Sequence, residues 1–303
     1  MVVVDRGSAG LRGPIAVCET EQVERQIFTS ESFRRDGKLI ERRGRSRAGP
    51  EWSTLRRYDA GGRVIEEEHT GFRPQILTYR YDVRGRLQRI DIRRPDGSER
   101  IYESYLYFDD QTSAVTRYID PPLRDTNTVV AAESMLDMSA DAVCILTAFD
   151  RSGRPVKRVL YDADERVIRR VLLQYNRSGK LMEEGEAESG GRLNPDLRNL
   201  YRYDAAGRCV EVEMHWGAIG GRREINSYNE RGDLKEEHVL PVKPEIELFE
   251  TPPWVTLYDY EYDTQGNWTL RSAQIRGAES TAIIRTDTTR RTFEYWSSAT
   301  TGA

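Results

Sequence analysis

The sequence contains few of the residues that build metal centres and disulfide frameworks. Its 303 residues include three cysteines and three histidines, and Cys18, Cys144 and Cys209 lie far apart with no C-x-x-C spacing. A sparse, odd set of cysteines argues against a disulfide-stapled fold, and the missing C-x-x-C pairs remove the usual zinc motif. We therefore expect no metal and no cofactor, and we interpret the three cysteines as packing residues.

Long hydrophobic runs are also missing. Only Val2, Val3 and Val4 precede Asp5 at the N-terminus, which is too short for the core of a signal peptide, and no run approaches the length of a transmembrane helix. We expect no transmembrane segment. The compartment stays open: cytoplasmic, or envelope-associated or secreted if an export signal has been removed.

No segment carries the basic excess of a nucleic-acid-binding protein. Forty-six basic and fifty acidic residues give a net charge of −4, which argues against nucleic acid as a partner. The one local exception is the stretch RRGRSR at residues 42–47. We interpret it as a solvated connection between the first two hairpins, with contact to an anion or a polysaccharide as the alternative.

Familiar catalytic motifs are absent as well. The sequence has no G-x-S-x-G, H-E-x-x-H, P-loop or G-x-G-x-x-G motif. His69 and His238 follow glutamates at like positions of different repeats. The simplest interpretation is that both lie on the polar ends of strands, and a metal pair or an acid–base pair are the alternatives. We predict no catalytic residue.

What the sequence does contain is a repeated β-hairpin. In residues 201–216 (YRYDAAGRCVEVEMHW) two tyrosines alternate with polar residues before a turn, and apolar residues alternate with polar ones after it. This period of two is typical of a β-strand. Between the two strands, Asp204 and Gly207 fit a three-residue hairpin loop in which the glycine adopts the left-handed conformation.

The same pattern recurs along the chain as an aromatic residue, usually Asp or Asn, two variable residues, Gly, and usually Arg or Lys. The copies begin at Phe33, Tyr58, Tyr81, Phe149, Tyr161, Tyr175, Tyr203, Tyr228 and Tyr262, and a degenerate copy begins at Phe108. The expected turn residues are Gly37, Tyr58, Asp59, Gly62, Tyr81, Asp82, Gly85, Phe149, Asp150, Gly153, Tyr175, Asn176, Gly179, Tyr203, Asp204, Gly207, Tyr228, Asn229, Gly232, Tyr262, Asp263 and Gly266. Glu165 is the poorest fit, because the left-handed conformation costs a non-glycine residue about 1–2 kcal/mol.

These copies give the chain a resemblance to the YD-repeat (Rhs-repeat) family of bacterial proteins, as a short stand-alone member. The resemblance extends from LRGPIAV at residues 11–17 to YDTQGNW at 262–268 and RRTFEYW at 290–296. It implies a long antiparallel sheet of consecutive hairpins that curls on itself, as in large members that enclose a toxin. The shell, cargo and self-cleavage of those members do not carry over, because this chain is short and residues 120–123 (DPPL) match their cleavage motif only superficially.

The predicted fold is all-β: an antiparallel meander from tandem hairpins in one long twisted sheet, curled into an open spiral or barrel-like shell. Ten motif turns imply about 20 strands, and open sheets rarely exceed about ten strands without curling. A repeat chain grows without splitting, so we expect a single domain over residues 1–303. Residues 101–108 carry apolar side chains on both faces and are expected to be covered on both sides.

Three stretches interrupt the pattern. Residues 119–139 are expected to form an insertion with a short helix, and residues 185–199 a long polar connection. The prolines of residues 240–253 exclude a central strand, so this segment is expected to lie over an edge or to cap the sheet.

Aromatic residues supply the candidate ligand contacts. The tyrosine of each repeat is expected on the inward face, where it stabilises the sheet by cross-strand packing. Trp268 and Trp296 are interpreted as core residues. Trp52, Trp216 and Trp254 lie near connections and are the candidates for ligand binding.

These observations favour a non-catalytic binding or scaffolding protein that contacts a carbohydrate or protein partner at the bacterial cell envelope. One alternative is a hydrolase-type enzyme with its site in the mouth of the curled sheet, gathering histidines and carboxylates. Another is a shell or immunity-like partner of a separately encoded toxin. The oligomeric state stays open.

Overall fold

The computed structural model describes residues 11–47, 49–71, 74–108, 113–118, 143–188, 190–242 and 253–296. The strands are β1 (Ile15–Gln22), β2 (Ile27–Phe33), β3 (Leu39–Ser46), β4 (Trp52–Tyr58), β5 (Val64–Thr70), β6 (Gln75–Tyr81), β7 (Leu87–Arg93), β8 (Glu99–Tyr107), β9 (Ser113–Tyr118), β10 (Cys144–Phe149), β11 (Pro155–Tyr161), β12 (Val167–Tyr175), β13 (Leu181–Ala187), β14 (Leu193–Tyr203), β15 (Cys209–His215), β16 (Gly221–Tyr228), β17 (Leu234–Pro241), β18 (Trp254–Tyr262), β19 (Trp268–Gly277) and β20 (Ile283–Tyr295). A short 3-10 helix, η2 (Gly217–Ile219), lies between β15 and β16.

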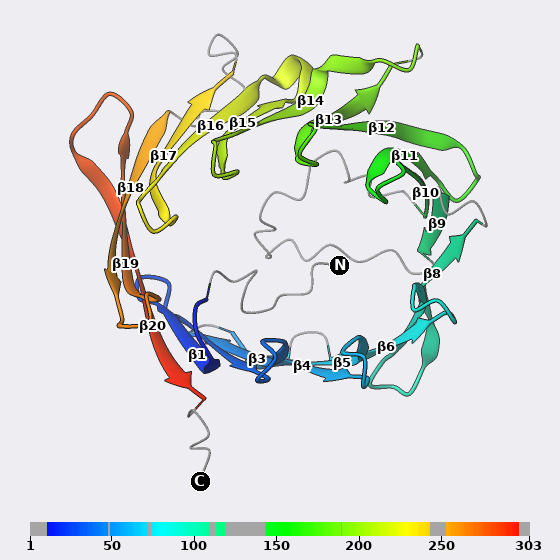
Figure 1. Ribbon diagram of the computed structural model, residues 1–303, viewed down its shortest axis with the longest axis horizontal. Coiled ribbons are helices and arrows are strands. Elements are labelled where there is room, and N and C mark those ends of the chain that lie inside the picture. Colours follow the sequence, from blue (N-terminus) through cyan, green and yellow to red (C-terminus); the bar gives the residue numbers. More distant parts are fainter. Residues whose placement is uncertain are drawn as a thin grey trace.

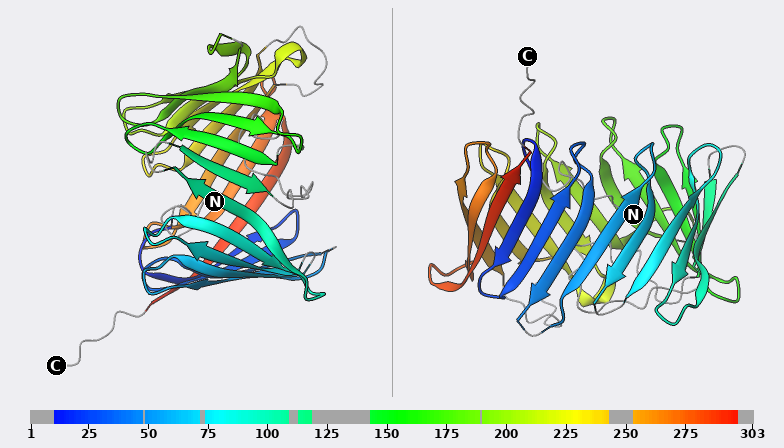
Figure 2. Two further views of the ribbon diagram at one scale, coloured as in Figure 1. Left: turned by 90° about the vertical axis from the view of Figure 1, so that its right-hand side faces the viewer. Right: turned by 90° about the horizontal axis from the view of Figure 1, so that it is seen from below.

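All the strands form one 20-stranded antiparallel sheet, which confirms the predicted all-β meander. Consecutive strands pair throughout, and β1 pairs both with β2 and with β20. The two ends of the meander therefore meet, and the tilted strands surround a central space (Figures 1 and 2). Because every described strand has a neighbour on each side, the described sheet presents no unpaired strand edge.

An aspartate and a glycine set the regular turn. In the β4–β5 hairpin, Gly62 has a φ of +78° and donates its N–H to the Asp59 carbonyl oxygen at 2.9 Å. Asp59 Oδ1 accepts the backbone N–H of Arg63 at 2.8 Å. The same aspartate contact recurs at Asp82, Asp150, Asp162 and Asp204. In the turn that begins at Asp162, Glu165 occupies the glycine position with a φ of +61°, without the conformational freedom of a glycine.

Each regular hairpin contacts the one before it through its tyrosine. The Tyr81 hydroxyl donates to the Val64 carbonyl oxygen at 2.7 Å, and the Arg63 guanidinium lies 4.8 Å from the centre of the Tyr81 ring. The hydrogen bond recurs from Tyr175 to Pro155, from Tyr203 to Leu181 and from Tyr228 to Cys209. The repeated tyrosine and the basic residue after the glycine thus fix one hairpin against the next.

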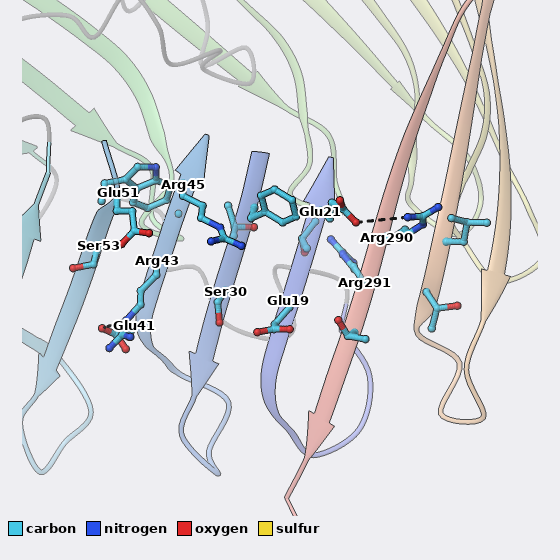
Figure 3. A pocket seen from close by; sticks show the side chains of 18 of the residues that line it. Glu19, Glu21, Ser30, Glu41, Arg43, Arg45, Glu51, Ser53, Arg290 and Arg291 are labelled. Atoms are coloured by element: carbon cyan, nitrogen blue, oxygen red, sulfur yellow. Dashed lines mark hydrogen bonds and ion pairs between the residues drawn. The ribbon is translucent and has the colours of Figure 1, made fainter. Parts of the chain in front are cut away.

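The two faces of the wall differ in character. The inward face carries the buried apolar clusters, such as the one formed by Val64, Leu77, Tyr79, Ile90 and Ile92. On the opposite face Glu19, Ser30 and Arg43 lie directly across from one another on β1, β2 and β3, and Figure 3 shows these strands from outside the ring. The wall is one sheet thick, so its outer face stays in contact with solvent.

This single layer corrects the expectation that residues 101–108 are covered on both sides. Leu106 is 61% exposed and Phe108 is 42% exposed. No second layer of the described residues packs against the outer face at this place, so the apolar side chains on that face remain in water.

Two polar stretches expected as connections belong to strands instead. Residues 42–46 lie in β3, where Arg42 faces inward and pairs with Glu31 at 2.6 Å while Arg43 and Arg45 are exposed. In residues 185–199 the link between β13 and β14 is a tight turn, closed by the N–H of Gly191 on the Glu188 carbonyl oxygen at 2.9 Å. Polar residues are tolerated in these strands because every second side chain of a strand lies on the outer face of the sheet, in contact with water.

The remaining irregular stretches fall largely outside the described residues. The insertion expected at 119–139 lies outside them, as do residues 243–252. Leu240 and Pro241 complete β17, a strand with neighbours on both sides. Pro241 is tolerated because the pairing of β17 with β18 ends at Val239, so no partner there needs its missing N–H.

Candidate functional site

A groove crosses the outer face of the wall where β1 meets β20 (Figure 3). Its volume is about 1050 Å³, and strands β1 to β5 and β18 to β20 line it. Two adjacent rows of side chains run across its strands, one with Glu21, Phe28 and Arg45 and the other with Glu19, Ser30 and Arg43. The antiparallel register places these side chains on one face because directly opposite residues point the same way.

The charges of the groove are balanced and accessible. The Arg43 Nε atom lies 2.8 Å from Glu41 Oε1, and Arg290 Nη1 lies 3.7 Å from Glu21 Oε2. The side chains of Arg43 and Arg290 are 69% and 62% exposed. Exposed pairs of this kind add little to stability. Their donors and acceptors can therefore exchange partners with a polar ligand at small energetic cost.

One of the three candidate tryptophans, Trp52, borders this groove, but its ring lies on the inner face of the sheet, because its partner Gly44 shares the face of the inward-pointing Arg42. Trp52 lies over Gly44, where a side chain would place its Cβ 2.2 Å from the indole Cζ2, so the ring requires a glycine opposite it. Trp216 precedes η2, and Trp254 begins β18 with the Arg222 guanidinium 5.2 Å from its ring centre. All three are half-buried, and the structure does not bring them together.

The three histidines are dispersed over both faces. Each pairs with the glutamate two residues before it: His69 with Glu67 at 2.8 Å, His215 with Glu213 at 2.7 Å and His238 with Glu236 at 2.7 Å. Following the cross-strand partners from β5 to β17 puts Glu237, not His238, on the face of His69. The expectation of like positions is wrong, because His238 is one residue closer to its turn glycine than His69 is.

Glu67 belongs to a polar cluster on the inner wall. Its Oε2 atom lies 2.5 Å from Arg56 Nε, and both side chains are largely buried. Burial acts to raise the pKa of the Glu67 carboxyl, but the hydrogen bond from His69 and the charge of Arg56 outweigh it and hold the pKa below its ordinary value. The cluster is a charge-balanced part of the wall, with each member facing a partner.

The pKa of a second carboxylate on the inner face, that of Glu237, is shifted in the opposite direction. Burial, followed by the negative charge of Glu224, raises the pKa of Glu237, and Tyr258 donates a hydrogen bond to it at 3.4 Å. Across the described ranges no group of three or more His, Cys, Asp or Glu side chains is arranged to hold a metal ion.

Sequence reasoning missed most of the groove. Gly44 carried a signal, since an isolated glycine within a strand pattern often marks a close approach of another group. The acidic and basic residues of the two rows carried none, because charged residues are common on every strand of this chain and only the register selects the ones that meet.

Comparisons with known proteins give a family and distant structural likenesses. A family model described as "Uncharacterised protein" matches residues 131–291, more than half of the chain. No curated protein matches.

Within the described ranges, no helix has the length and apolar character needed to cross a membrane.

Two solved structures are distantly similar to the chain. The chain is similar to a porin-like protein from Bacteroides uniformis, with a TM-score of 0.38 and 11% identity over 93% of this chain and 98% of that one. It is also similar to a chain of TcdB2-TccC3, with a TM-score of 0.39 and 11% identity over 88% of this chain and 17% of that one. The chain thus spans a small part of the toxin chain, and neither likeness is close enough to carry a function.

Proposed function

The chain belongs to the family whose model is described as an uncharacterised protein, and we propose that it is a non-catalytic scaffold whose wall binds a carbohydrate or protein partner at the bacterial cell envelope. The observation that carries this proposal is the groove of about 1050 Å³ across the junction of β1 and β20. The envelope setting rests on the resemblance of the repeats to bacterial YD-repeat proteins.

The chemistry of the groove supports a polar, extended partner. Hydroxyl groups of Ser30, Ser53 and Thr70 lie among carboxylates and guanidinium groups, and Ser53 and Thr70 are already hydrogen-bonded at 2.8 Å. Sugar hydroxyls and peptide groups both donate and accept hydrogen bonds, so either would match this mixture. The ring of Phe28, in the row with Glu21 and Arg45, adds a flat apolar contact of the kind that sugar rings use.

The test is binding of the purified chain to a glycan array and to cell-envelope fractions. We expect saturable binding that is lost when Arg43→Ala and Phe28→Ala are combined, with the β-rich circular dichroism unchanged. The matched control combines Trp216→Ala with Trp254→Ala, which leaves the groove intact and should retain binding.

Two results would overturn the proposal. One is the absence of binding to every glycan and envelope fraction. The other is equal loss of binding in the groove variant and the control, which would place the contact elsewhere on the molecule. Retention on envelope fractions but on no glycan would identify the partner as a protein.

A further inference from the structure

The β18–β19 hairpin lacks the carboxylate that balances charge in the β4–β5 hairpin. In β4 and β5, Arg56 lies opposite Glu67, five residues after the turn glycine. At the matching places in β18 and β19, Tyr260 lies opposite Arg271, again five residues after the turn glycine. A cation therefore replaces the anion on the inner wall.

A second cation adjoins the first. The Arg291 guanidinium lies 3.7 Å from the centre of the Trp268 ring, and the Arg271 guanidinium lies 5.3 Å from it. Both arginines thus stack on one indole. Cation–π contacts hold guanidinium groups against a ring, but they do not neutralise the charge.

Neither arginine has an ion-pair partner among the described residues. Arg271 Nη2 donates to Thr289 Oγ1 at 3.3 Å, and the Nε atoms of Arg271 and Arg291 are buried without an acceptor. Burial lowers the pKa of Arg291, which reports how poorly its charge is compensated.

The carboxylates that act on Arg291 from neighbouring strands are already engaged. Glu31 on β2 pairs with Arg42 at 2.6 Å. Asp233, in the turn before β17, accepts the Tyr262 hydroxyl at 2.8 Å. The Cys18 thiol also faces Arg291, and burial raises the pKa of this thiol, so that it stays neutral.

We propose that Trp268, Arg271 and Arg291 form an inward-facing oxyanion site that takes one carboxylate or phosphate group of a ligand inside the ring. Guanidinium groups bind such groups through paired N–H donors in a fixed planar geometry. An anion between the two cations relieves their mutual repulsion and supplies acceptors for donors that the described chain leaves unused. The register directs Arg271 and Arg291 to the inner face, opposite the groove side chains Glu19, Ser30 and Arg43, although Arg291 also borders the groove.

The experiment measures thermal unfolding of the full chain in inorganic phosphate and in acetate, each against sodium chloride at matched ionic strength. We expect a saturable rise in Tm with at least one of the two anions. Arg291→Gln should weaken the apparent affinity at least about tenfold, which corresponds to about 1.4 kcal/mol of binding free energy. Arg271→Gln serves as a second variant if the first folds poorly.

Arg290→Gln is the matched control. Arg290 directly precedes Arg291 on β20, but its side chain faces the outer groove, where it pairs with Glu21. This variant should keep the response to the anion. A response to acetate alone would assign a carboxylate ligand, and one to phosphate alone a phosphate.

The proposal fails if neither anion raises Tm above the sodium chloride reference. It fails equally if Arg291→Gln and Arg271→Gln respond as the unmodified protein does. A loss of Tm in Arg291→Gln, without any anion response in the unmodified protein, would reduce the two arginines to packing partners of Trp268.

Discussion

The β4–β5 and β18–β19 hairpins have the same type of turn, but the residue after the turn glycine contacts a different neighbour in each, by a different kind of interaction. After Gly62, Arg63 lies over the ring of Tyr81 in the next hairpin. After Gly266, Asn267 instead holds the start of the chain: its Oδ1 accepts the Arg12 N–H at 2.6 Å and its Nδ2 donates to the Arg12 carbonyl oxygen at 2.8 Å.

The difference shows how a repeat continues and how it stops. A cation over an aromatic ring tolerates small shifts, so it suits a contact that recurs from hairpin to hairpin. An amide with two partners in a buried place accepts one geometry only, and Asn267 is 3% exposed. The β18–β19 hairpin thus has a specific contact in place of an adaptable one, and on its inner face it has two cations in place of an ion pair.

The largest expected effect comes from breaking the balanced inner wall of the earlier hairpin. Glu67→Ala leaves Arg56 buried without its anion, and removing one member of such a pair costs about 3–5 kcal/mol. Urea unfolding followed by circular dichroism measures the loss. The double variant Arg56→Met with Glu67→Leu should recover most of it, and an equally unstable double variant would contradict this account.

The next effect tests the closure of the ring. Asn267→Ala removes the contacts to Arg12 and the hydrogen bond to the Tyr295 hydroxyl at 2.9 Å, and should cost about 2–3 kcal/mol because buried groups lose their partners. Its counterpart Arg63→Ala should cost less than about 1 kcal/mol, since the contacts of Arg63 are exposed. Equal losses in urea unfolding would remove the distinction between the two turns.

A smaller effect should follow from restoring the carboxylate. Arg271→Glu places an anion beside Arg291, as Glu67 lies beside Arg56, and should stabilise the protein by about 1 kcal/mol. The same variant should abolish the response to phosphate and acetate. Destabilisation measured by urea unfolding would show that the stacking of Arg271 on Trp268 outweighs the repulsion between the arginines.

The smallest effects per residue concern pH. The backbone N–H and side chain of Arg63 hold the pKa of Asp59 below its ordinary value, so the stability it contributes is present above about pH 3.9 and is lost as pH falls through the lower folded pKa. At the closure, burial and the hydrogen bond to Asp263 raise the pKa of Tyr295 to about 12, so its contribution is present below about pH 10 and is lost as pH rises toward 12.

Acid should therefore weaken the regular turns, and alkali the closure. Urea midpoints measured across the pH range test this contrast. Tyr295→Phe should reduce the alkaline loss and leave the acid limb unchanged. An alkaline limb that is the same in Tyr295→Phe would refute the role given to this hydroxyl.

The sequence predicts the fold well and the candidate sites poorly, because the turns depend on adjacent residues while the sites depend on how distant strands align. Turn chemistry is local, so Asp59 and Gly62 identify their hairpin from a few adjacent letters. The meeting of Arg271 with Arg291, or of Glu19 with Ser30 and Arg43, depends on register between strands. A difference of one residue in the distance from the turn glycine moves a side chain to the other face, as the differing faces of His69 and His238 show.

The pairing of β1 with β20 also bears on the order in which the chain folds. The other described pairings join strands that follow one another in sequence, so each hairpin can form as soon as both of its strands have left the ribosome. The contact between Arg12 and Asn267 spans 255 residues and must wait for nearly the whole chain. Chains that end early would keep two bare strand edges open to other chains, so the pairing of β20 with β1 is what protects both of these edges from association with other chains.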